Sequence, residues 1–285
     1  MKATPDKYPS LYVVPTPLGN LADITTRSLD VLRNVDWVAA EDTRHTAQLL
    51  RHFDISARLM AAHEHNEEAA AQQVIGKLRD GEDVALVSDA GTPAVSDPGA
   101  RLVARVRESG FRVVPLPGPC AAITALSAAG LNEAHFLFYG FLPAKAKQRQ
   151  EALHELADLP YTLVFYEAPH RILETVETLL AVLGGKRTLV IARELTKLFE
   201  TIHSCPLSEA MTWLREDENR QRGEFVLMVS AASLSRNKAD GEGKRILKLL
   251  LDDGLPVSQA AKLAHAITGV GKNTLYESAL ALKEP

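Results

Sequence analysis

Short apolar segments alternate with helical patterns along the first 230 residues, and this alternation constrains the fold more than any other feature. Strands and helices that follow one another in this way are typical of a parallel sheet covered by helices on both faces. The sequence therefore predicts an α/β fold. The expected strands occupy residues 11–17, 35–40, 84–88, 111–117, 135–141, 161–168, 187–194 and 224–230.

The length of 285 residues suffices for about two domains, since single domains usually take roughly 100–200 residues. We place a first α/β domain at residues 1–118 and a second at 119–232, where Gly118-Pro119 opens a new helix. The remaining residues, 233–285, begin with a polar linker over 233–244. They continue as three short amphipathic helices with a helix-turn-helix-like arrangement.

Composition excludes several classes of protein. The two cysteines, Cys120 and Cys205, cannot form a disulfide scaffold or a four-thiolate zinc site. No run approaches the roughly 18 apolar residues of a membrane span, and the N-terminus lacks the apolar core of a signal peptide, so we expect a cytoplasmic protein. The net charge of −4 does not by itself indicate a nucleic-acid partner, although residues 235–285 carry eight basic and six acidic side chains.

One loop carries an unusual density of turn-forming and polar residues. The segment SDAGTPAVSDPG, residues 88–99, directly follows a buried strand and contains two glycines and two prolines. Such loops usually approach a ligand closely, and ligands of open α/β sheets gather at the carboxyl ends of strands. We therefore predict a ligand loop at residues 88–99. The segment PTPLGN at 15–20 lacks the GxGxxG pattern of a dinucleotide site, so we interpret it as a turn, even with Glu41-Asp42 available as a ribose-binding acid.

Capping residues predict several helix starts. Asp97, which precedes a proline, is expected to cap one helix, and Asn66 is expected to cap another that opens with two glutamates. Thr43 is the expected cap of the helix that begins with Arg44 and His45.

The segment HEHNEE, residues 63–68, contains two histidines with carboxylates nearby. Two histidines without a third ligand at a fixed spacing are a weak metal signal, because zinc sites use three or four protein ligands. A polar strand end that faces the cleft is the better interpretation. We predict no metal site here.

Seven segments have distinctive sequences: PTPLGNLADIT, AAEDTRHT, HEHNE, LVSDAGTPAVSDPG, PLPGPCAA, GFLPAK and ARELTK. Together they resemble the tetrapyrrole methylase family, in particular its members that methylate small-subunit ribosomal RNA. The resemblance extends over about residues 10–280. It implies two α/β domains with S-adenosylmethionine bound in the cleft between them. It also implies a homodimer that methylates the ribose 2′-hydroxyl of a cytidine in the decoding region of 16S rRNA, within the small ribosomal subunit.

The resemblance also carries the family's methyl-donor contacts onto this chain. Tetrapyrrole methylases commonly show GGDP where this chain has SDAGTP. An adenine ring needs an apolar slot, which Val95, Ala121 and Tyr166 suit. Cys120 is interpreted as a small pocket residue rather than a nucleophile, because no partner base is evident. The predicted donor contacts are Pro17, Ser88, Asp89, Ala90, Gly91, Val95, Cys120, Ala121, Tyr166, Glu167, Ala192 and Leu195.

Basic residues in a first helical turn oppose the helix dipole, which suggests a function for them. The amides and cationic side chains of such a turn can together bind a phosphate, as an RNA methylase requires. Surface charges screened by solvent are the alternative interpretation. The predicted RNA-binding residues are Arg44, His45, Lys145, Lys147, His170 and Arg171.

Methyl transfer to a hydroxyl is an in-line displacement, so the protein must align the reacting atoms and help remove the hydroxyl proton. Glu167 is the leading candidate for the proton acceptor, because it adjoins a predicted donor contact. The acids expected at strand ends are Glu41, Asp42, Asp89, Glu167 and Glu194.

Two other functions stay open. The first is a related methyltransferase that acts on a tetrapyrrole or a protein side chain, and the basic helix starts and the helical tail count against it. The second is a nucleic-acid-binding regulator that reads DNA with its tail. The expected recognition helix, NTLYESALAL, contains no Arg or Lys, which argues against this role. We interpret the tail as an RNA-docking or stabilising module.

Overall fold

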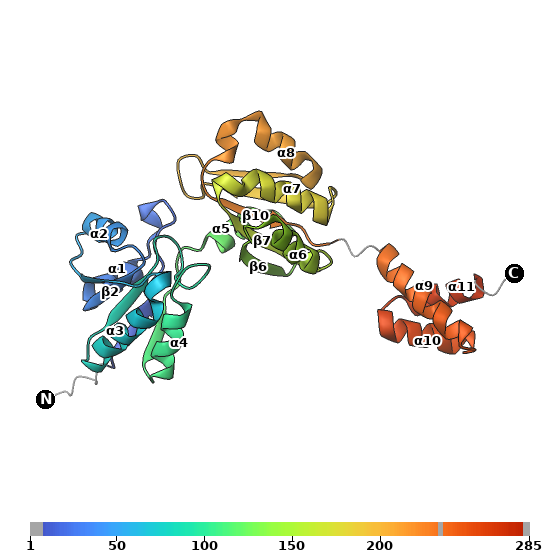
Figure 1. Cartoon of the computed structure of the whole chain (residues 1–285), viewed down its shortest axis with the longest axis horizontal. Helices are drawn as coiled ribbons and strands as arrows, with labels where there is room; N and C mark the ends of the chain where they lie inside the picture. Colours follow the sequence, from blue (N-terminus) through green and yellow to red (C-terminus); the bar gives the residue numbers. More distant parts are fainter. Residues whose placement is uncertain (1–7, 233–235, 282–285) are drawn as a thin grey trace.

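The computed structural model describes residues 8–232 and 236–281, and within them it contains two five-stranded sheets followed by three helices (Figure 1). The predicted fold class, two α/β domains with a small helical C-terminal domain, is confirmed. The domain boundaries at residues 118 and 232 stay a prediction.

The first sheet is parallel throughout, as the alternation of strands and helices predicts, with the order β3-β2-β4-β1-β5. Its strands are β1 (Ser10–Val13), β2 (Trp37–Ala40), β3 (Arg58–Ala61), β4 (Val84–Val87) and β5 (Arg112–Pro115). The connecting helices are η1 (Leu21–Asp23), α1 (Thr26–Asn34), α2 (Thr43–His52), η2 (Glu64–Asn66), α3 (Glu67–Arg79) and α4 (Ala100–Glu108), where η marks a 3₁₀ turn.

Helices cover both faces of this sheet because its central strands are apolar on both sides. On β4, Val84 and Leu86 belong to the core formed with α3 and α4, whereas Ala85 and Val87 belong to the core formed with α1 and α2. Successive strand residues point to opposite faces, so one continuous apolar strand contributes to two cores. The loops that follow β1, β2 and β4 therefore emerge together at one edge of the sheet.

The second sheet is mixed, with the order β6-β7-β10-β8-β9. Its strands are β6 (Phe136–Phe141), β7 (Thr162–Glu167), β8 (Thr188–Arg193), β9 (Thr201–Pro206) and β10 (Phe225–Val229). Its helices are α5 (Ala121–Ala128), α6 (Ala146–Leu156), η3 (Pro169–Arg171), α7 (Ile172–Leu183), α8 (Leu207–Glu216) and η4 (Glu218–Gln221).

Strand β10 runs antiparallel to both of its neighbours. Its first residue, Phe225, pairs with Glu167 on β7 and with Arg193 on β8, the last residues of those strands. The start of β10 and the ends of β7 and β8 therefore share one edge. Helix α5 covers one face of the sheet, and α6, α7 and α8 cover the other.

The tail consists of α9 (Arg236–Asp252), α10 (Val257–Thr268) and α11 (Lys272–Ala281), which bury a core of their own. The prediction of a linker over residues 233–244 is wrong from Arg236 onward, and residues 233–235 lie outside the described part. Gly243 packs against the tail core, where a Cβ would lie 3.0 Å from side-chain atoms of both Val270 and Leu275. This glycine permits close helix packing instead of ending the helix. No helix of the described residues has the length and apolar character needed to cross a membrane.

Two of the predicted helix caps are wrong. Helix α4 starts after Gly99, whose φ of 122° is favourable for glycine, and Asp97 lies in the preceding loop. The cap of α2 is Asp42, whose carboxylate accepts a hydrogen bond of 2.8 Å from the Arg44 amide, so Thr43 is already helical.

Candidate functional site

The loop after β1 and the 88–99 loop after β4 are joined by main-chain hydrogen bonds. The Thr16 amide donates to the Gly91 carbonyl and the Gly91 amide donates to the Thr16 carbonyl, both at 2.9 Å. The Thr16 hydroxyl also donates to the Ser88 carbonyl at 3.0 Å. Gly91 has a φ of 82°, which favours glycine, so the sequence of the loop allows this close pairing.

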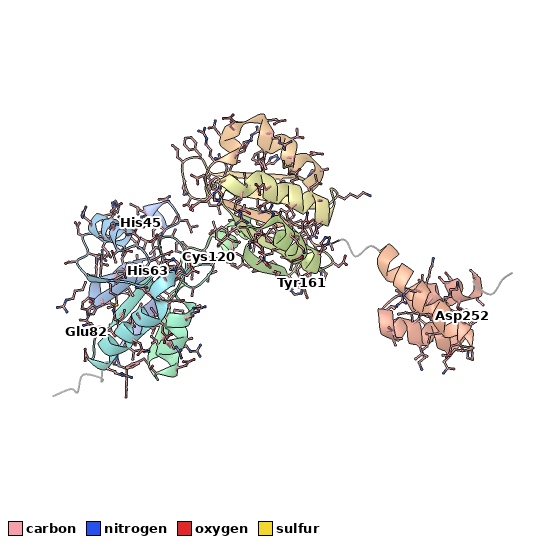
Figure 2. All side chains as sticks on the ribbon, in the orientation of Figure 1. His45, His63, Glu82, Cys120, Tyr161 and Asp252 are labelled. Atoms are coloured by element: carbon pink, nitrogen blue, oxygen red, sulfur yellow. The ribbon has the colours of Figure 1, made fainter. Side chains whose placement is uncertain are left out.

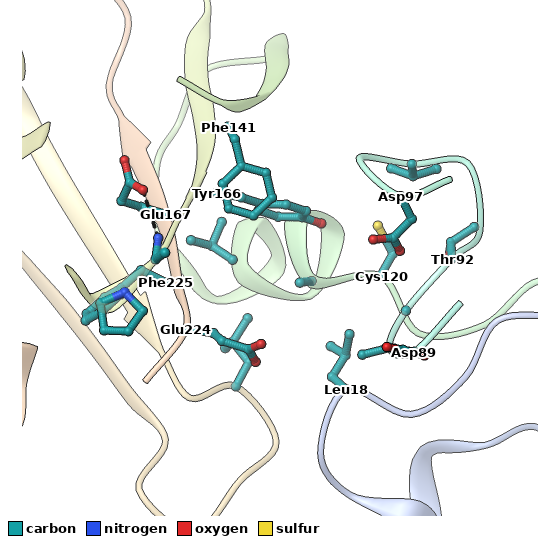
Figure 3. Close-up of a pocket in the computed structure, with 18 of the residues that line it drawn as sticks. Leu18, Asp89, Thr92, Asp97, Cys120, Phe141, Tyr166, Glu167, Glu224 and Phe225 are labelled. Atoms are coloured by element: carbon teal, nitrogen blue, oxygen red, sulfur yellow. Dashed lines mark hydrogen bonds between the residues drawn. The ribbon is translucent and has the colours of Figure 1, made fainter. Parts of the chain in front are cut away.

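A cavity of about 390 Å³ lies between the two sheets, within the size range of small-molecule sites. In Figure 3, Leu18, Asp89 and Asp97 lie on the wall formed by loops of the first sheet, and Phe141 and Tyr166 lie on the opposite wall. The lining residues are Leu18, Glu41, Asp89, Ala90, Gly91, Thr92, Val95, Asp97, Cys120, Ala121, Phe141, Tyr166, Glu167, Ala168, Pro169, Leu195, Glu224, Phe225 and Val226. The site thus combines apolar surface with a few polar groups.

Three carboxylates gather on the first wall. Asp89 accepts a hydrogen bond of 3.1 Å from the Asp42 amide. Burial and the negative charge of Asp89 raise the pKa of Glu41. Burial, together with the charge of Glu41, raises the pKa of Asp97 to about 6. Near neutral pH the Asp97 carboxylate is therefore ionised yet still basic enough to accept a proton.

On the second wall, Tyr166 joins β7 to the start of α5. Its hydroxyl accepts a hydrogen bond of 3.0 Å from the Ala122 amide, one of the amides that an α-helix leaves without an internal partner. Burial raises the pKa of Tyr166, so the phenol stays neutral. Phe138 and Phe141 contact its ring edge-to-face. Cys120, the N-cap residue of α5, lies at the junction between the two sheets (Figure 2).

Lys197 links the two walls at one end of the cavity. Its ammonium lies 2.9 Å from a carboxylate oxygen of Glu194 and 2.7 Å from one of Glu224. Its aliphatic stem crosses Gly19, where an added Cβ would come within 2.4 Å of the Lys197 Cγ. The loop 15–20 therefore requires a glycine at this point, because the stem of a residue from the second sheet covers it.

Comparison with known proteins agrees with this arrangement. The profile of the Tetrapyrrole (Corrin/Porphyrin) Methylases matches residues 10–211, which include the strands of both walls except β10. The chain belongs to the tetrapyrrole methylase family. The profile of the RsmI C-terminal HTH domain matches residues 237–283.

Relatives match nearly the full length of the chain. It is 56% identical over 270 residues to the Ribosomal RNA small subunit methyltransferase I of Escherichia coli O157:H7, covering 95% of this chain and 94% of that protein. It is 53% identical to the protein of the same name from Vibrio cholerae serotype O1, covering 97% and 96% respectively.

Solved structures of more distant methyltransferases share the fold. The methyltransferase CobJ is 19% identical with a TM-score of 0.60, covering 79% of this chain and 95% of that one. The uroporphyrin-III-C-methyltransferase of Thermus thermophilus is 21% identical with a TM-score of 0.55, covering 78% and 94%.

Most of the donor contacts that the family resemblance implies line the cavity, namely Asp89, Ala90, Gly91, Val95, Cys120, Ala121, Tyr166, Glu167 and Leu195. Three others lie behind its surface. Pro17 and Ser88 are buried within the paired loops, and Ala192 is fully buried in the core beneath α5. These three positions support the wall without forming it.

Several lining residues were not among the predicted contacts. Glu224 precedes β10, and Phe225 and Val226 are its first residues. An antiparallel strand presents its start, not its end, at the edge where ligands gather. Phe141 belongs to the GFLP segment. Its large ring lies close in sequence to a glycine and a proline, which interrupt regular secondary structure, and this combination could indicate a site residue. Asp97 was assigned to a helix cap.

The geometry argues against Glu167 as the proton acceptor. Its side chain is fully buried, and Oε2 accepts a hydrogen bond of 2.6 Å from the Thr175 hydroxyl. Oε1 accepts one of 2.8 Å from the Ala168 amide and lies 3.3 Å from Arg171 Nε. In Figure 3 the carboxylate points away from the opposite wall. Glu167 is therefore engaged with the helical side of the sheet.

The same contacts argue against Arg171 as a phosphate ligand. Its side chain is 18% exposed, and Nη2 donates a hydrogen bond of 2.6 Å to the Leu142 carbonyl. Arg44 differs, since its side chain is 89% exposed and pairs with Asp42 at 3.1 Å. A hydrogen bond from Arg44 lowers the pKa of Asp42 to about 2, so this pair offsets the unfavourable dipole. The remaining predicted RNA-binding residues are exposed: His45, Lys145, Lys147 and His170.

Proposed function

We propose that the protein transfers a methyl group from S-adenosylmethionine to the ribose 2′-hydroxyl of a cytidine in the decoding region of 16S rRNA. The observation that carries the proposal is the cavity between the two sheets, whose walls hold both apolar surface and carboxylates, in a chain of this family. The names of the relatives supply the class of substrate, ribosomal RNA of the small subunit.

The lining residues fit a donor of this chemistry. Val95, Ala121 and Leu195 offer apolar contact to a flat base, and Gly91 keeps the backbone open to close approach. Glu41 and Asp89 offer acceptors for hydroxyl or ammonium groups and a negative potential that suits a sulfonium cation. When bound, S-adenosylmethionine supplies an electrophilic methyl group.

We assign proton removal to Asp97. Its carboxylate lies on the cavity wall, and its pKa of about 6 lets it take a proton near neutral pH. With S-adenosylmethionine bound, Asp97 would accept the proton of the acceptor hydroxyl as the oxygen–carbon bond forms. The bond between the methyl carbon and sulfur would break, its electron pair would go to sulfur, and S-adenosylhomocysteine would leave. Fixed positions for both reactants supply the rest of the rate enhancement.

Exposed basic residues lie close in sequence to residues that line the cavity, and their side chains suit the phosphates of an RNA backbone. Arg44 and His45 follow Asp42 at the start of α2, and His170 follows the lining residue Pro169. Lys145 is the N-cap residue of α6 and Lys147 lies in its first turn, shortly after Phe141. We propose these five as phosphate contacts. We also propose that the protein acts as a homodimer in the cytoplasm, on rRNA within the small ribosomal subunit.

Incubation with isotopically labelled methyl donor tests the proposal. The acceptors are small ribosomal subunits, naked rRNA and a tetrapyrrole, and nucleoside analysis follows. Label on the 2′-oxygen of a cytidine is the expected result. Label on the tetrapyrrole with none on RNA would contradict the proposal and favour the chemistry of the structural neighbours.

A further inference from the structure

The N-cap residue of helix α4 has no side chain that could accept hydrogen bonds from the first amides of the helix. The N-cap residue is Gly99, with a φ of 122°, and an added Cβ would lie 2.9 Å from Leu86 Cδ2 on β4. Serine, threonine, aspartate and asparagine usually cap helices, and the contact and the backbone conformation both disfavour them here. The acceptor for the first amides of α4 must therefore come from another element.

Glu67, the first residue of α3, supplies this acceptor. Its Oε1 accepts hydrogen bonds from the Gly99 amide at 2.7 Å and the Arg101 amide at 3.1 Å, and the residue is only 8% exposed. A carboxylate at a helix N-terminus is also favoured by the helix dipole. Glu67 belongs to the HEHNE segment, and no residue of that segment lines the cavity.

The loop that Glu67 anchors is strained. Ala94 and Ser96 have φ values of 69° and 61°, in the left-handed backbone region that is unfavourable for residues other than glycine. They flank Val95 and precede Asp97, two residues that line the cavity. The backbone angles at Ala94 and Ser96 thus set where these two side chains point.

We propose that Glu67 is a positioning residue for the methyl-donor site. By capping α4 from α3 it fixes the end of the 88–99 loop, and the loop then keeps the strained conformation that places Val95 and Asp97 on the cavity wall. The proposal rests on the proposed function for the identity of the ligand, whereas the anchor is a contact within the free protein.

Two substitutions separate the effect of the length of the Glu67 side chain from the effect of its charge. Glu67→Asp keeps the carboxylate but shortens the side chain by one carbon, so it no longer reaches both amides. Glu67→Gln keeps the length and an acceptor oxygen but loses the charge. Glu68→Asp is the matched control, because Glu68, the neighbour of Glu67, also contacts α4, through an exposed ion pair with Arg105 at 3.1 Å.

Each full-length variant is titrated with S-adenosylhomocysteine by calorimetry. We expect Glu67→Asp to weaken binding about tenfold, in the range of the effect of a lost helix cap. Glu67→Gln should retain most of the wild-type affinity, and Glu68→Asp should match the wild type. Circular dichroism confirms that each variant is folded. Wild-type affinity in Glu67→Asp, or a weaker affinity in Glu67→Gln than in Glu67→Asp, would overturn the proposal.

Amide hydrogen exchange on the ligand-free chains tests the anchor without the donor. Exchange in residues 92–101 should be faster in Glu67→Asp than in the wild type and in Glu68→Asp. Unchanged exchange there would overturn the proposal even if donor affinity falls. If the wild type does not bind S-adenosylhomocysteine, the proposed function fails, and faster local exchange in Glu67→Asp still supports the anchor.

Discussion

Asp97 shows how a neighbouring residue can override a local sequence signal for a helix cap. An aspartate before a proline usually caps a helix, but the following glycine takes the cap position and leaves Asp97 on the cavity wall. There, burial and the charge of Glu41 make ionisation unfavourable, which raises its pKa to about 6. The charged carboxylate at neutral pH is thus a local destabilisation, of the kind that active sites often contain.

Asp97→Asn should lower the rate of methyl transfer by about 10²–10⁴-fold, the usual contribution of a general base, and leave donor affinity within a few-fold. Single-turnover kinetics and calorimetry measure the two effects. Asp80→Asn, at an exposed position after α3, is the control and should leave the rate unchanged. A rate for Asp97→Asn within a few-fold of the wild type would exclude Asp97 as the base.

The raised pKa also predicts how pH affects stability. Because the folded chain holds the Asp97 proton more tightly than the unfolded chain, the stability that Asp97 contributes is present below pH 4 and is lost as pH rises through about 6. Asp97→Asn should therefore be more stable than the wild type at pH 7.5, by about 1 kcal/mol after allowance for partial exposure. The difference should vanish at pH 4, as denaturant unfolding at both values will show. A variant less stable than the wild type at pH 7.5 would contradict this linkage.

The order of side chains on a strand explains which site residues could be predicted. The loop 88–99 could be identified from its position after a buried strand, and Tyr166 from the resemblance. Tyr166 and Glu167 are adjacent on β7, so they point to opposite faces of the sheet. Because Tyr166 faces the cavity, Glu167 faces the opposite side of the sheet, which α6, α7 and α8 cover. There it contacts Arg171 and Thr175. The direction of a side chain could not be read from its proximity in sequence.

At the scale of elements, the strands that sequence patterns did not reveal are edge strands. β3 and β9 each lie at the edge of a sheet, and they read RLMA and TIHSCP. An edge strand lacks a neighbour on one side and carries more polar residues, so no continuous apolar run marks it. The central strands β4, β7, β8 and β10 are buried on both faces and were all predicted.

The junction between the 88–99 loop and α4 predicts opposite effects for two glycine substitutions. Gly99→Ala should destabilise the protein by about 2 kcal/mol, because φ is 122° and the new methyl group meets Leu86. Gly76→Ala, inside α3 with open space around it, should stabilise by about 0.5–1 kcal/mol. Urea unfolding measures both. Equal stability of the two variants would show that the start of α4 is not conformationally restricted.

At the scale of the whole molecule, the chain divides its apolar residues among separate cores. Each sheet has one core on each of its faces, the tail has another, and the cavity lies between the sheets. A contact between the two halves is made by the aliphatic stem of Lys197, which packs on Gly19. This separation suggests that the tail can be removed without disturbing the donor site.

A chain that ends at Ala232 should therefore bind the methyl donor with the affinity of the full-length protein. Its affinity for rRNA should fall, because the removed segment carries a net positive charge. Calorimetry with the donor and a filter-binding assay with rRNA measure the two. Loss of donor binding in a folded truncation would show that the tail forms part of the donor site.

The most direct test of the account is calorimetric titration of the Ala121→Trp variant with S-adenosylmethionine. Ala121 lines the cavity at the start of α5, so an indole there should occupy the space that we assign to the donor. Ala128→Trp, an exposed position on the same helix, is the matched control. We predict one donor per chain in the wild type and in Ala128→Trp, and no measurable binding in a folded Ala121→Trp. Wild-type affinity in Ala121→Trp would show that the donor binds elsewhere.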